Sequence, residues 1–243
     1  MPRFFLPPAA WLASGPQSAL TGDEARHLAQ VLRIQPGASI TVFDGQGRRA
    51  PAKVLEVSRA RVTLELGAAL PPRPILPAIT LAQAIPKGKN MDLIVQKAVE
   101  LGIASIQPLV TRHTIVHPGE GKSEKWRRTA LEACKQCGQD LLPDIPEALA
   151  FAAWLAAQSA VPGLRLIASL AGAARPLRDV LHDHPGTTHA TLLIGPEGDF
   201  SPDETTAAIA AGFLPISLGA IVLRVETASL FCLSALRYEF AST

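Results

Sequence analysis

Two stretches near the end of the chain each pass from a short apolar run, through a glycine-containing loop, into a predicted helix: residues 192–204 and residues 218–228. In the first, Ser201 is a predicted helix N-cap, Pro202 occupies the first helical position, and Glu204 completes a capping box. The turn before this helix is therefore bracketed on both sides, and its glycines let a ligand approach the backbone because they have no Cβ atom. The pattern predicts a binding loop between a buried strand and a helix.

Alternating strands and helices are predicted through most of the chain. Apolar runs predict further buried strands at residues 79–84, 106–110 and 164–170. Residues 91–101, between the first two runs, have the apolar spacing of a helix. We therefore expect an α/β fold with a largely parallel sheet. Ligands of such sheets bind at the carboxyl ends of strands, so we predict the pocket in three glycine-bearing loops, those after Leu170, Ile194 and Leu218.

A smaller, mainly β domain with one helix, at residues 23–32, is predicted for residues 1–70. Its strands are predicted from apolar alternation at residues 39–43, 53–57 and 62–66. Four prolines within residues 70–77 exclude helix and central strand, so we place a linker at 71–78 and a second domain at 79–243. Residues 1–73 contain nine Lys or Arg and five Asp or Glu. This charge distribution is typical either of a module that docks on nucleic acid or of an ordinary solvated basic surface.

Composition narrows the class of protein further. The 48% hydrophobic content is ample for a packed core, and no apolar run approaches the roughly 18 residues that a membrane span needs. Pro7 and Pro8 interrupt the first apolar segment too early for a secretory signal. Three cysteines cannot all pair, which favours a reducing cytoplasm. Cys134 and Cys137 share a predicted helix face with Trp126, which indicates half-buried packing, and without ligands at matching spacing we expect no metal.

Four motifs, taken in order, resemble those of the SPOUT methyltransferase family that methylates N3 of a uridine in 16S ribosomal RNA. They are Lys87-Gly88 followed by residues 96–102, Glu132-Ala133 with Gln136 and Gly138, the Gly-Pro-Glu-Gly loop at residues 195–198, and residues 223–228. The resemblance covers most of the chain. Asp199 stands where the family usually has a second glycine, and Gln139 where it usually has arginine. Because aspartate tolerates left-handed backbone geometry, we expect the turn at Asp199 to keep its shape.

This resemblance implies an α/β knot, with a trefoil knot toward the end of residues 79–243, preceded by a PUA-like RNA-binding β domain at residues 1–70. It also implies a homodimer built in part by the last helix, residues 227–240, and a partner that is 16S ribosomal RNA or the small ribosomal subunit. The implied cofactor is S-adenosylmethionine. The residues expected to bind it are Leu170, Ala171, Ile194, Gly195, Pro196, Glu197, Gly198, Leu218, Gly219, Ile221, Leu223, Thr227 and Ala228.

Methylation at uracil N3 requires that the target base be unpaired or flipped out, and that its N3 proton leave. Arg224 is the predicted residue that orients the uracil or stabilises its anion, because a guanidinium stays charged. Glu226 is the predicted catalytic carboxylate, with Glu197 or solvent as the alternative proton acceptor and a backbone cap as the alternative role. The residues expected to contact RNA are Arg3, Arg26, Arg33, Arg48, Lys87, Lys89 and Arg112.

Other functions fit parts of the sequence. The loop at residues 195–198 precedes a helix and could cradle a nucleotide phosphate, although it lacks a Gly-Lys-Ser/Thr ending and an acidic pair suited to magnesium. The basic first domain would equally suit a ribosome-assembly factor that binds RNA without catalysis. A third alternative is a methyltransferase of the same superfamily with another target, such as a tRNA ribose. Cofactor binding separates the first two alternatives from an enzyme that uses S-adenosylmethionine.

Overall fold

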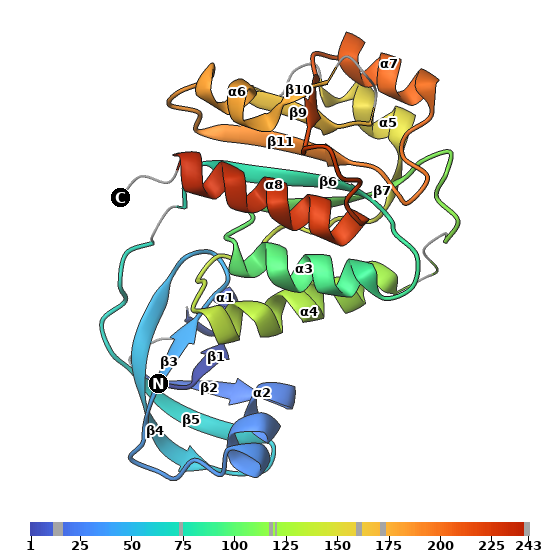
Figure 1. Ribbon diagram of the computed structural model, residues 1–243. Coiled ribbons are helices and arrows are strands. Elements are labelled where there is room, and N and C mark those ends of the chain that lie inside the picture. Colours follow the sequence, from blue (N-terminus) through green and yellow to red (C-terminus); the bar gives the residue numbers. More distant parts are fainter. Residues whose placement is uncertain are drawn as a thin grey trace. The chain divides into compact units, whose positions relative to one another are not determined.

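The computed structural model describes residues 1–11, 17–72, 75–116, 119, 121–158, 162–170 and 174–240. The chain divides into two compact units (Figure 1). The first comprises Met1–Pro74 and Leu131–Leu142, and the second comprises Ile75–Ala130 and Pro143–Thr243. The sequence predicted a first domain of residues 1–70, whereas the structure also includes a segment from much later in the chain in the first unit.

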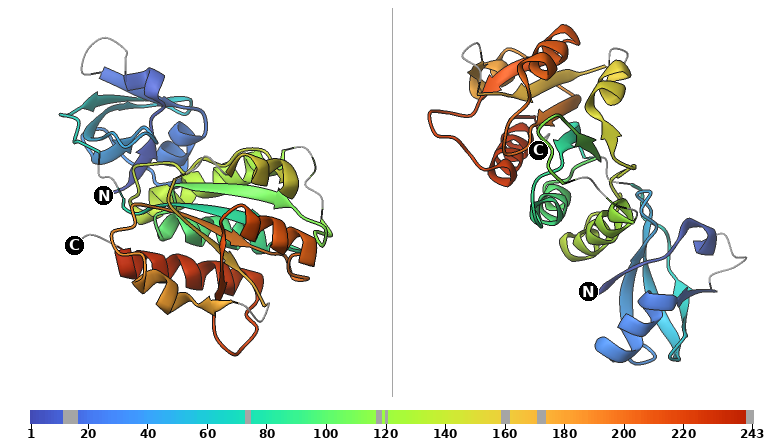
Figure 2. Two further views of the ribbon diagram at one scale, coloured as in Figure 1. Left: turned by 90° about the horizontal axis from the view of Figure 1, so that it is seen from above. Right: turned by 90° about the vertical axis from the view of Figure 1, so that its right-hand side faces the viewer.

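The first unit is built on a curled sheet (Figure 2). Among its described residues, five strands lie in the order β1-β3-β4-β5-β2; β1 pairs with β3 in parallel, and the other neighbours are antiparallel. The elements are β1 (Arg3–Phe5), α1 (Pro8–Trp11), β2 (Gln17–Thr21), α2 (Gly22–Arg26), η1 (His27–Val31), β3 (Ser39–Phe43), β4 (Arg49–Val57) and β5 (Arg61–Leu66). Alternate residues of each strand face a common core, which includes Phe4, Leu20, Ile40, Val54 and Leu64.

The single helix predicted at residues 23–32 has two parts in the structure. α2 continues directly into η1, which is a π-helix. Ala25, Leu28 and Leu32 fall at helical spacing within the predicted helix; Ala25 and Leu28 are buried, but Leu32 lies beyond the helix and is exposed. The switch to π geometry changes which residues share a face, because each turn then takes more residues than an α-helical turn.

The second unit has a sheet in which every neighbouring pair is parallel. Over the described residues its seven strands lie in the order β10-β12-β9-β11-β6-β7-β8. The strands are β6 (Ala78–Ala84), β7 (Ser105–Val110), β8 (Leu149–Ala150), β9 (Leu164–Ala168), β10 (Arg175–Pro176), β11 (His189–Ile194) and β12 (Leu214–Ser217). The helices that belong wholly to this unit are α3 (Asn90–Glu100), α5 (Phe151–Ala156), α6 (Leu177–His182), α7 (Pro202–Ala210) and α8 (Val225–Phe240). α4 (Lys122–Cys137) begins in this unit, and its residues from Leu131 onward belong to the first unit.

The central strands of this sheet are buried on both faces. β6, β7, β9 and β11 are nearly continuous runs of buried residues, as parallel strands covered by helices on both sides should be. α3 and α8 pack on one face, while α5 and α7 cover the other (Figure 1). The core under α5 and α7 joins Phe151 and Trp154 of α5 to Leu193 of β11. The mixed α/β fold with a parallel sheet, predicted from the sequence, is confirmed.

Strand order decides where the site lies. Because β9, β11 and β12 are parallel, their carboxyl ends meet at one edge of the sheet, and the loops after them converge there. The predicted third strand, ending at Leu218, lies slightly earlier in the structure: β12 ends at Ser217, and Ile221 and Val222 belong to an exposed loop. The capping box at the start of α7 has both of its reciprocal hydrogen bonds, as predicted.

Two further expectations can be compared with the structure. Cys134 and Cys232 are buried, but Cys137 is exposed, so the prediction that Cys137 is half-buried beside Cys134 was wrong. Cys137 is the last residue of α4 and is exposed, whereas Trp126 and Cys134, earlier in the same helix, are buried. Within the described residues, none of the helices has the length and apolar character needed to cross a membrane.

Candidate functional site

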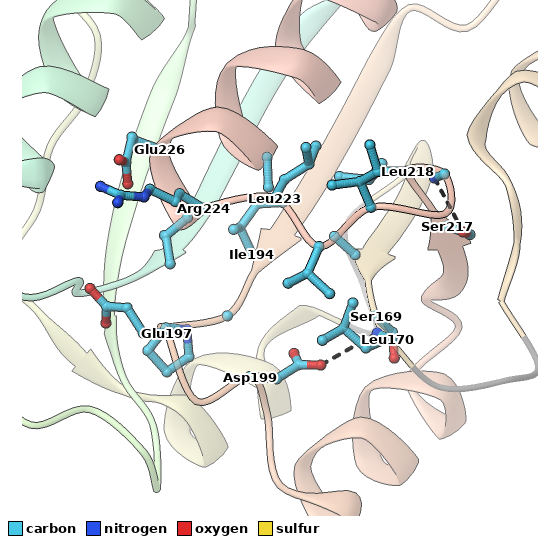
Figure 3. Close-up of a pocket in the computed structure, with 18 of the residues that line it drawn as sticks. Ser169, Leu170, Ile194, Glu197, Asp199, Ser217, Leu218, Leu223, Arg224 and Glu226 are labelled. Carbon is cyan, nitrogen blue, oxygen red and sulfur yellow. Dashed lines mark hydrogen bonds between the residues drawn. The ribbon is translucent and has the colours of Figure 1, made fainter.

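A cavity of about 800 Å³ lies at the carboxyl ends of β9, β11 and β12 (Figure 3). Three loops line it, the segments that follow these strands, together with the start of α8. The predicted cofactor-binding residues that line it are Leu170, Ile194, Gly195, Pro196, Glu197, Leu218, Gly219, Ile221, Leu223 and Ala228. Gly198 and Thr227 are not among the lining residues, and Ala171 lies outside the described residues.

The loop after β11 is held in a tight turn by Asp199. Its φ of 57° is left-handed, as expected of the residue that replaces a glycine, and its backbone N–H donates to the Pro196 carbonyl at 2.9 Å. One carboxylate oxygen of Asp199 accepts from the Phe200 N–H at 2.8 Å, and the other from the Leu170 N–H at 3.4 Å. Asp199 therefore ties the loop after β11 to the loop after β9, a contact that glycine could not make (Figure 3).

Gly195 and Gly219 are needed for different reasons. A Cβ atom built on Gly195 would lie 3.0 Å from the Asp199 carboxylate and 3.2 Å from the Phe200 ring, so a larger residue would have to push these two side chains aside. Gly219 has a φ of 117°, which side-chain-bearing residues rarely adopt. Apolar side chains line the cavity next to these two glycines. Among them, Leu170 and Ile221 are 68% and 79% exposed. The cavity thus combines bare backbone with apolar walls.

Charged groups gather at one end of the cavity, where Arg224, Glu226 and Glu197 lie (Figure 3). Glu226 is in the first turn of α8, where the positive end of the helix dipole favours a carboxylate. Its Oε2 accepts a hydrogen bond from Asn90 Nδ2 at 3.1 Å. The Arg224 side chain is exposed and has no hydrogen bond or ion pair to any described residue. A free guanidinium and an oriented carboxylate therefore stand together at the mouth of the cavity.

A buried polar contact joins the first turns of α8 to strand β6 of the sheet. Ser229 Oγ donates to Gln83 Oε1 at 2.6 Å, and both side chains are fully buried. Gln83 lies near the end of β6, and its amide Nε2 donates to the Ala84 carbonyl at 2.9 Å. Since every polar atom of this contact is paired in the core, it fixes the first turns of α8 relative to the sheet. Arg224 and Glu226 are therefore carried on a rigid support.

Asn90 and Asp199 line the cavity but were not predicted as site residues. Asn90 opens α3 directly after the Lys87-Gly88 motif, and this position was the signal available in the sequence. Asp199 was noticed only as a departure from a family pattern. Its role in joining two loops depends on the distance between β9 and β11, which the local sequence does not give. Both contributions therefore required the tertiary structure.

The predicted RNA-contacting residues fall into separate groups. Lys87 and Arg112 line a second pocket in the second unit, and Lys89 is exposed next to the start of α3. In the first unit, Arg3 is largely buried, and its guanidinium donates to Asp140 at 2.7 Å and to the Gln139 carbonyl at 3.1 Å. Its guanidinium is thus already paired within the unit.

The other three arginines of the first unit are more open. Arg26 pairs with Asp23 on the surface, and Arg33 is exposed with a left-handed backbone, φ 49°. Arg48 lies 3.5 Å from the Asp44 carboxylate and stacks over the Trp11 ring. These three remain candidates for contact with phosphate, whereas Arg3 has an intramolecular partner.

The sequence matches two families of domains. Residues 73–237 match the description "RNA methyltransferase domain", and residues 20–67 match "RNA methyltransferase PUA domain". A relative from Synechocystis, named ribosomal RNA small subunit methyltransferase E, is 32% identical over 86% of this chain and 69% of its own length. A Bacillus subtilis protein of the same name is 25% identical over 94% of this chain and 92% of its own length.

Solved structures of similar proteins cover nearly the whole chain. A Neisseria gonorrhoeae ribosomal RNA small subunit methyltransferase E, crystallised with S-adenosylmethionine, is 32% identical with a TM-score of 0.86, over 98% of this chain and 97% of that chain. A putative methyltransferase from Legionella pneumophila in complex with the same cofactor is also 32% identical with a TM-score of 0.86, over 97% and 96% of the two chains. The overall fold therefore resembles that of known SPOUT methyltransferases.

Proposed function

We propose that this chain, which belongs to the RNA methyltransferase family that includes ribosomal RNA small subunit methyltransferase E, transfers a methyl group from S-adenosylmethionine to N3 of a uracil in 16S ribosomal RNA. The observation that carries the proposal is the cavity in which three strand-end loops meet the side chains of Arg224 and Glu226. The relatives support the cofactor and the ribosomal RNA substrate. The uracil and its N3 atom follow from the motif resemblance and from the chemistry of the charged end.

The cavity suits S-adenosylmethionine in size and character. Its volume of about 800 Å³ is in the range of small-molecule sites. Leu170, Ile221 and Leu223 would contact the apolar faces of the cofactor, and the backbone around Gly195 and Gly219 would bond its polar edges. Glu197 and Glu226 supply negative charge next to a cationic sulfonium. When bound, the cofactor supplies an electrophilic methyl group.

The charged end of the cavity provides what N3 methylation needs. The target uracil enters unpaired, since its N3 atom lies on the pairing edge. Arg224, which has no partner among the described residues, bonds a uracil carbonyl oxygen and stabilises the negative charge that develops as the N3 proton leaves. Glu226 accepts that proton, and the Asn90 amide holds the carboxylate in place by bonding Oε2.

The domain plan, dimer and location complete the proposal. The first unit, Met1–Pro74 with Leu131–Leu142, is the PUA-like domain, and the second unit, Ile75–Ala130 with Pro143–Thr243, is the methyltransferase domain with its trefoil knot. A second copy of the chain packs on α8. Two aromatic side chains of this helix, seven residues apart, support this contact because they are exposed: Phe231 has an exposed fraction of 48% and Tyr238 of 90%. The enzyme acts in the cytoplasm, where small ribosomal subunits are found. Sedimentation of the purified chain, with Phe231→Glu as the variant expected to dissociate the dimer, tests the oligomer.

Calorimetric titration with S-adenosylmethionine, with ATP and GTP as controls, tests the cofactor. We expect saturable binding of S-adenosylmethionine alone. The transfer is tested on small ribosomal subunits assembled with transcribed, unmethylated 16S ribosomal RNA. Because an N3 methyl blocks base pairing, reverse transcription should stop at the modified uridine. Binding of a nucleoside triphosphate instead, or binding of the cofactor without any stop, would contradict the proposal.

The role of Arg224 is tested by Arg224→Ala. We expect turnover to fall by about 100-fold or more, as when a group that stabilises developing charge is removed. The affinity for S-adenosylmethionine should change little, since the loops after β9 and β11 are untouched. Arg178→Gln is a matched control because Arg178 is also an exposed arginine of the second unit but does not line the cavity. Turnover equal to that of the control would rule out this role.

A further inference from the structure

A second pocket, of about 520 Å³, lies next to the cofactor cavity. Glu197 lines both of them, so the two hollows are neighbours within the same unit. The second pocket is formed by the loops that follow β6, β7 and β11, which are adjacent in the sheet. Its polar lining includes Lys87, Arg112 and His113. The proposed function uses none of these three side chains.

Three contacts join these loops to one another. The Lys87 backbone N–H donates to Glu197 Oε1 at 2.9 Å, and the Arg112 backbone N–H donates to Glu204 Oε1 at 2.9 Å. His113 Nδ1 lies 2.9 Å from the Gly198 carbonyl oxygen and 3.0 Å from that of Asp199. Since a carbonyl can only accept, this nitrogen must carry the proton. The two carboxylates and the imidazole thus hold the backbone of the pocket together.

Gly198 permits this arrangement. A Cβ atom built on it would lie 3.1 Å from His113 Cβ, which is closer than nearly all real contacts of this kind. The predicted role of Gly198 was cofactor binding, yet it lines the second pocket and not the first. The glycine therefore serves the close approach of the loop after β11 to the loop after β7.

The charges in the pocket are not satisfied inside the unit. In the part of the chain that the structure describes, the Lys87 ammonium and the Arg112 guanidinium have no hydrogen bond or ion pair. Glu197 and Glu204 accept hydrogen bonds from the backbone N–H groups of these two residues and form no ion pair with their side chains. Two exposed cations that share a concave site attract an anion, and the planar guanidinium and the ammonium are the groups that bind phosphate.

We propose that this second pocket binds a backbone phosphate of the RNA next to the target nucleotide, with Lys87 and Arg112 as its ligands. The inference rests on the proposed function, because it places the phosphate beside the cavity that receives the base. Glu197 is the wall between the two sites, so a nucleotide whose base reaches Arg224 has its backbone near the second pocket. The contact positions the RNA and reads no sequence.

The test uses Lys87→Gln, Arg112→Gln and the double variant in the full chain. Each substitution keeps the backbone N–H that bonds Glu197 or Glu204, so the loops should stay joined. Affinity for transcribed 16S ribosomal RNA is measured across a range of salt concentrations. Each lost phosphate contact should make the negative slope of log affinity against log salt less steep by about 0.7, the value for single strands. With small ribosomal subunits as substrate, KM should rise about tenfold for each variant and kcat should stay within about twofold.

The controls separate this inference from others. Arg178→Gln removes an exposed charge elsewhere in the unit and should leave slope and KM unchanged, and Arg112→Lys should restore part of the lost affinity because it restores the charge. The dissociation constant for S-adenosylmethionine should be that of the wild type in every variant. If the wild type binds RNA but transfers no methyl group, the proposed function fails, yet the salt slopes still decide whether the pocket binds phosphate.

Other results would overturn the inference. An unchanged salt slope in the double variant would show that the pocket does not contact RNA. A fall in kcat at constant KM would assign the two residues to the chemical step. Titration with inorganic phosphate in the absence of RNA tests whether the pocket is instead a site for a free anion. That interpretation would hold if the wild type bound phosphate saturably, the double variant lost this binding, and the salt slopes for RNA affinity were the same in both.

Discussion

Basic side chains gather in both units, but they have different neighbours. In the first unit, Arg3 and Arg49 each donate to a different oxygen of Asp140 at 2.7 Å. All three side chains are largely buried, with 14%, 12% and 6% of their surface exposed. In the second unit, Lys87 and Arg112 are exposed and have no side-chain partner among the described residues. Paired, buried cations hold structure together, whereas unpaired, exposed cations are available to a ligand.

Asp140 explains why the segment Leu131–Leu142 belongs to the first unit. Around it, the Gly47 N–H donates to the Asp140 carbonyl at 3.1 Å and the Leu142 N–H to the Gly45 carbonyl at 2.9 Å. Arg3 bonds the neighbouring Gln139 through its backbone carbonyl, which any residue provides. The departure from the family pattern at position 139 therefore does not affect this contact. Charged groups here act beside the side chains of Leu141 and Leu142, which lie next to Gly45 and Gly47.

The largest effect is expected for Asp140→Ala. It leaves two largely buried guanidinium groups without their carboxylate, and such a change typically costs about 3–5 kcal/mol. Urea unfolding of the full chain measures the loss in the free energy of unfolding. The Lys87→Gln and Arg112→Gln variants are the comparison, and we expect no measurable loss for them. A loss of less than about 1 kcal/mol in the free energy of unfolding for Asp140→Ala would contradict the contrast between the buried, paired arginines of the first unit and the exposed cations of the second.

The reactivity of the Cys134 thiol reports on whether the contacts of Arg3 and Arg49 with Asp140 keep this region packed. Burial raises the pKa of Cys134 to about 12, with nearby Cys137 adding to the rise, so its thiol stays protonated and unreactive near pH 8. Burial also raises the pKa of Cys232 to about 12. In the native chain a disulfide reagent should label the exposed Cys137 quickly and the other two cysteines slowly. Asp140→Ala should accelerate labelling of Cys134 but not of Cys232; equal acceleration of both would indicate global unfolding.

A smaller effect is expected at the helix that supports the second pocket. In α7, Ser201 Oγ accepts from the Glu204 N–H at 3.3 Å, and the Ser201 N–H donates to Glu204 Oε2 at 2.9 Å. Ser201→Ala should lower the free energy of unfolding by about 1 kcal/mol, the usual contribution of an N-cap. RNA affinity should not change, because Glu204 Oε1 still holds the Arg112 backbone. A loss of RNA affinity equal to that of Arg112→Gln would show that the cap shapes the pocket.

The smallest effect is expected for an ion pair on the surface. Arg175 donates to Asp183 at 2.7 Å, and this hydrogen bond lowers the pKa of Asp183, with the charge of Arg175 acting in the same direction. Arg175→Gln should raise that pKa toward its ordinary value, which NMR titration of the carboxyl group measures. The melting temperature at neutral pH should not change measurably, because both side chains are well exposed. A clear drop in melting temperature would mean that exposure is a poor guide to the role of a charged pair.

Much of the second unit follows from local sequence. Apolar runs and helical spacing are local properties, and they predicted β6, β7, β9 and α3 to within a few residues. The capping box of α7 and the left-handed turn at Asp199 also follow from residue type, because they depend on one or two backbone angles. The predicted pocket at three strand ends coincides with the observed cavity for ten of its residues. In a parallel sheet the carboxyl ends of all the strands lie at the same edge, and the strand order then decides which of these ends are neighbours.

Only the tertiary structure decided which distant residues meet. Arg3 and Asp140 pair across 137 residues of sequence, whereas the sequence predicted Arg3 as one of the residues that contact RNA. The order of β11, β6 and β7 brings Lys87 and Arg112 to the loop that starts at Gly195, and it joins Asn90 to Glu226. Strand order and the burial of a charge depend on packing between segments far apart in the sequence, and no local pattern encodes that packing.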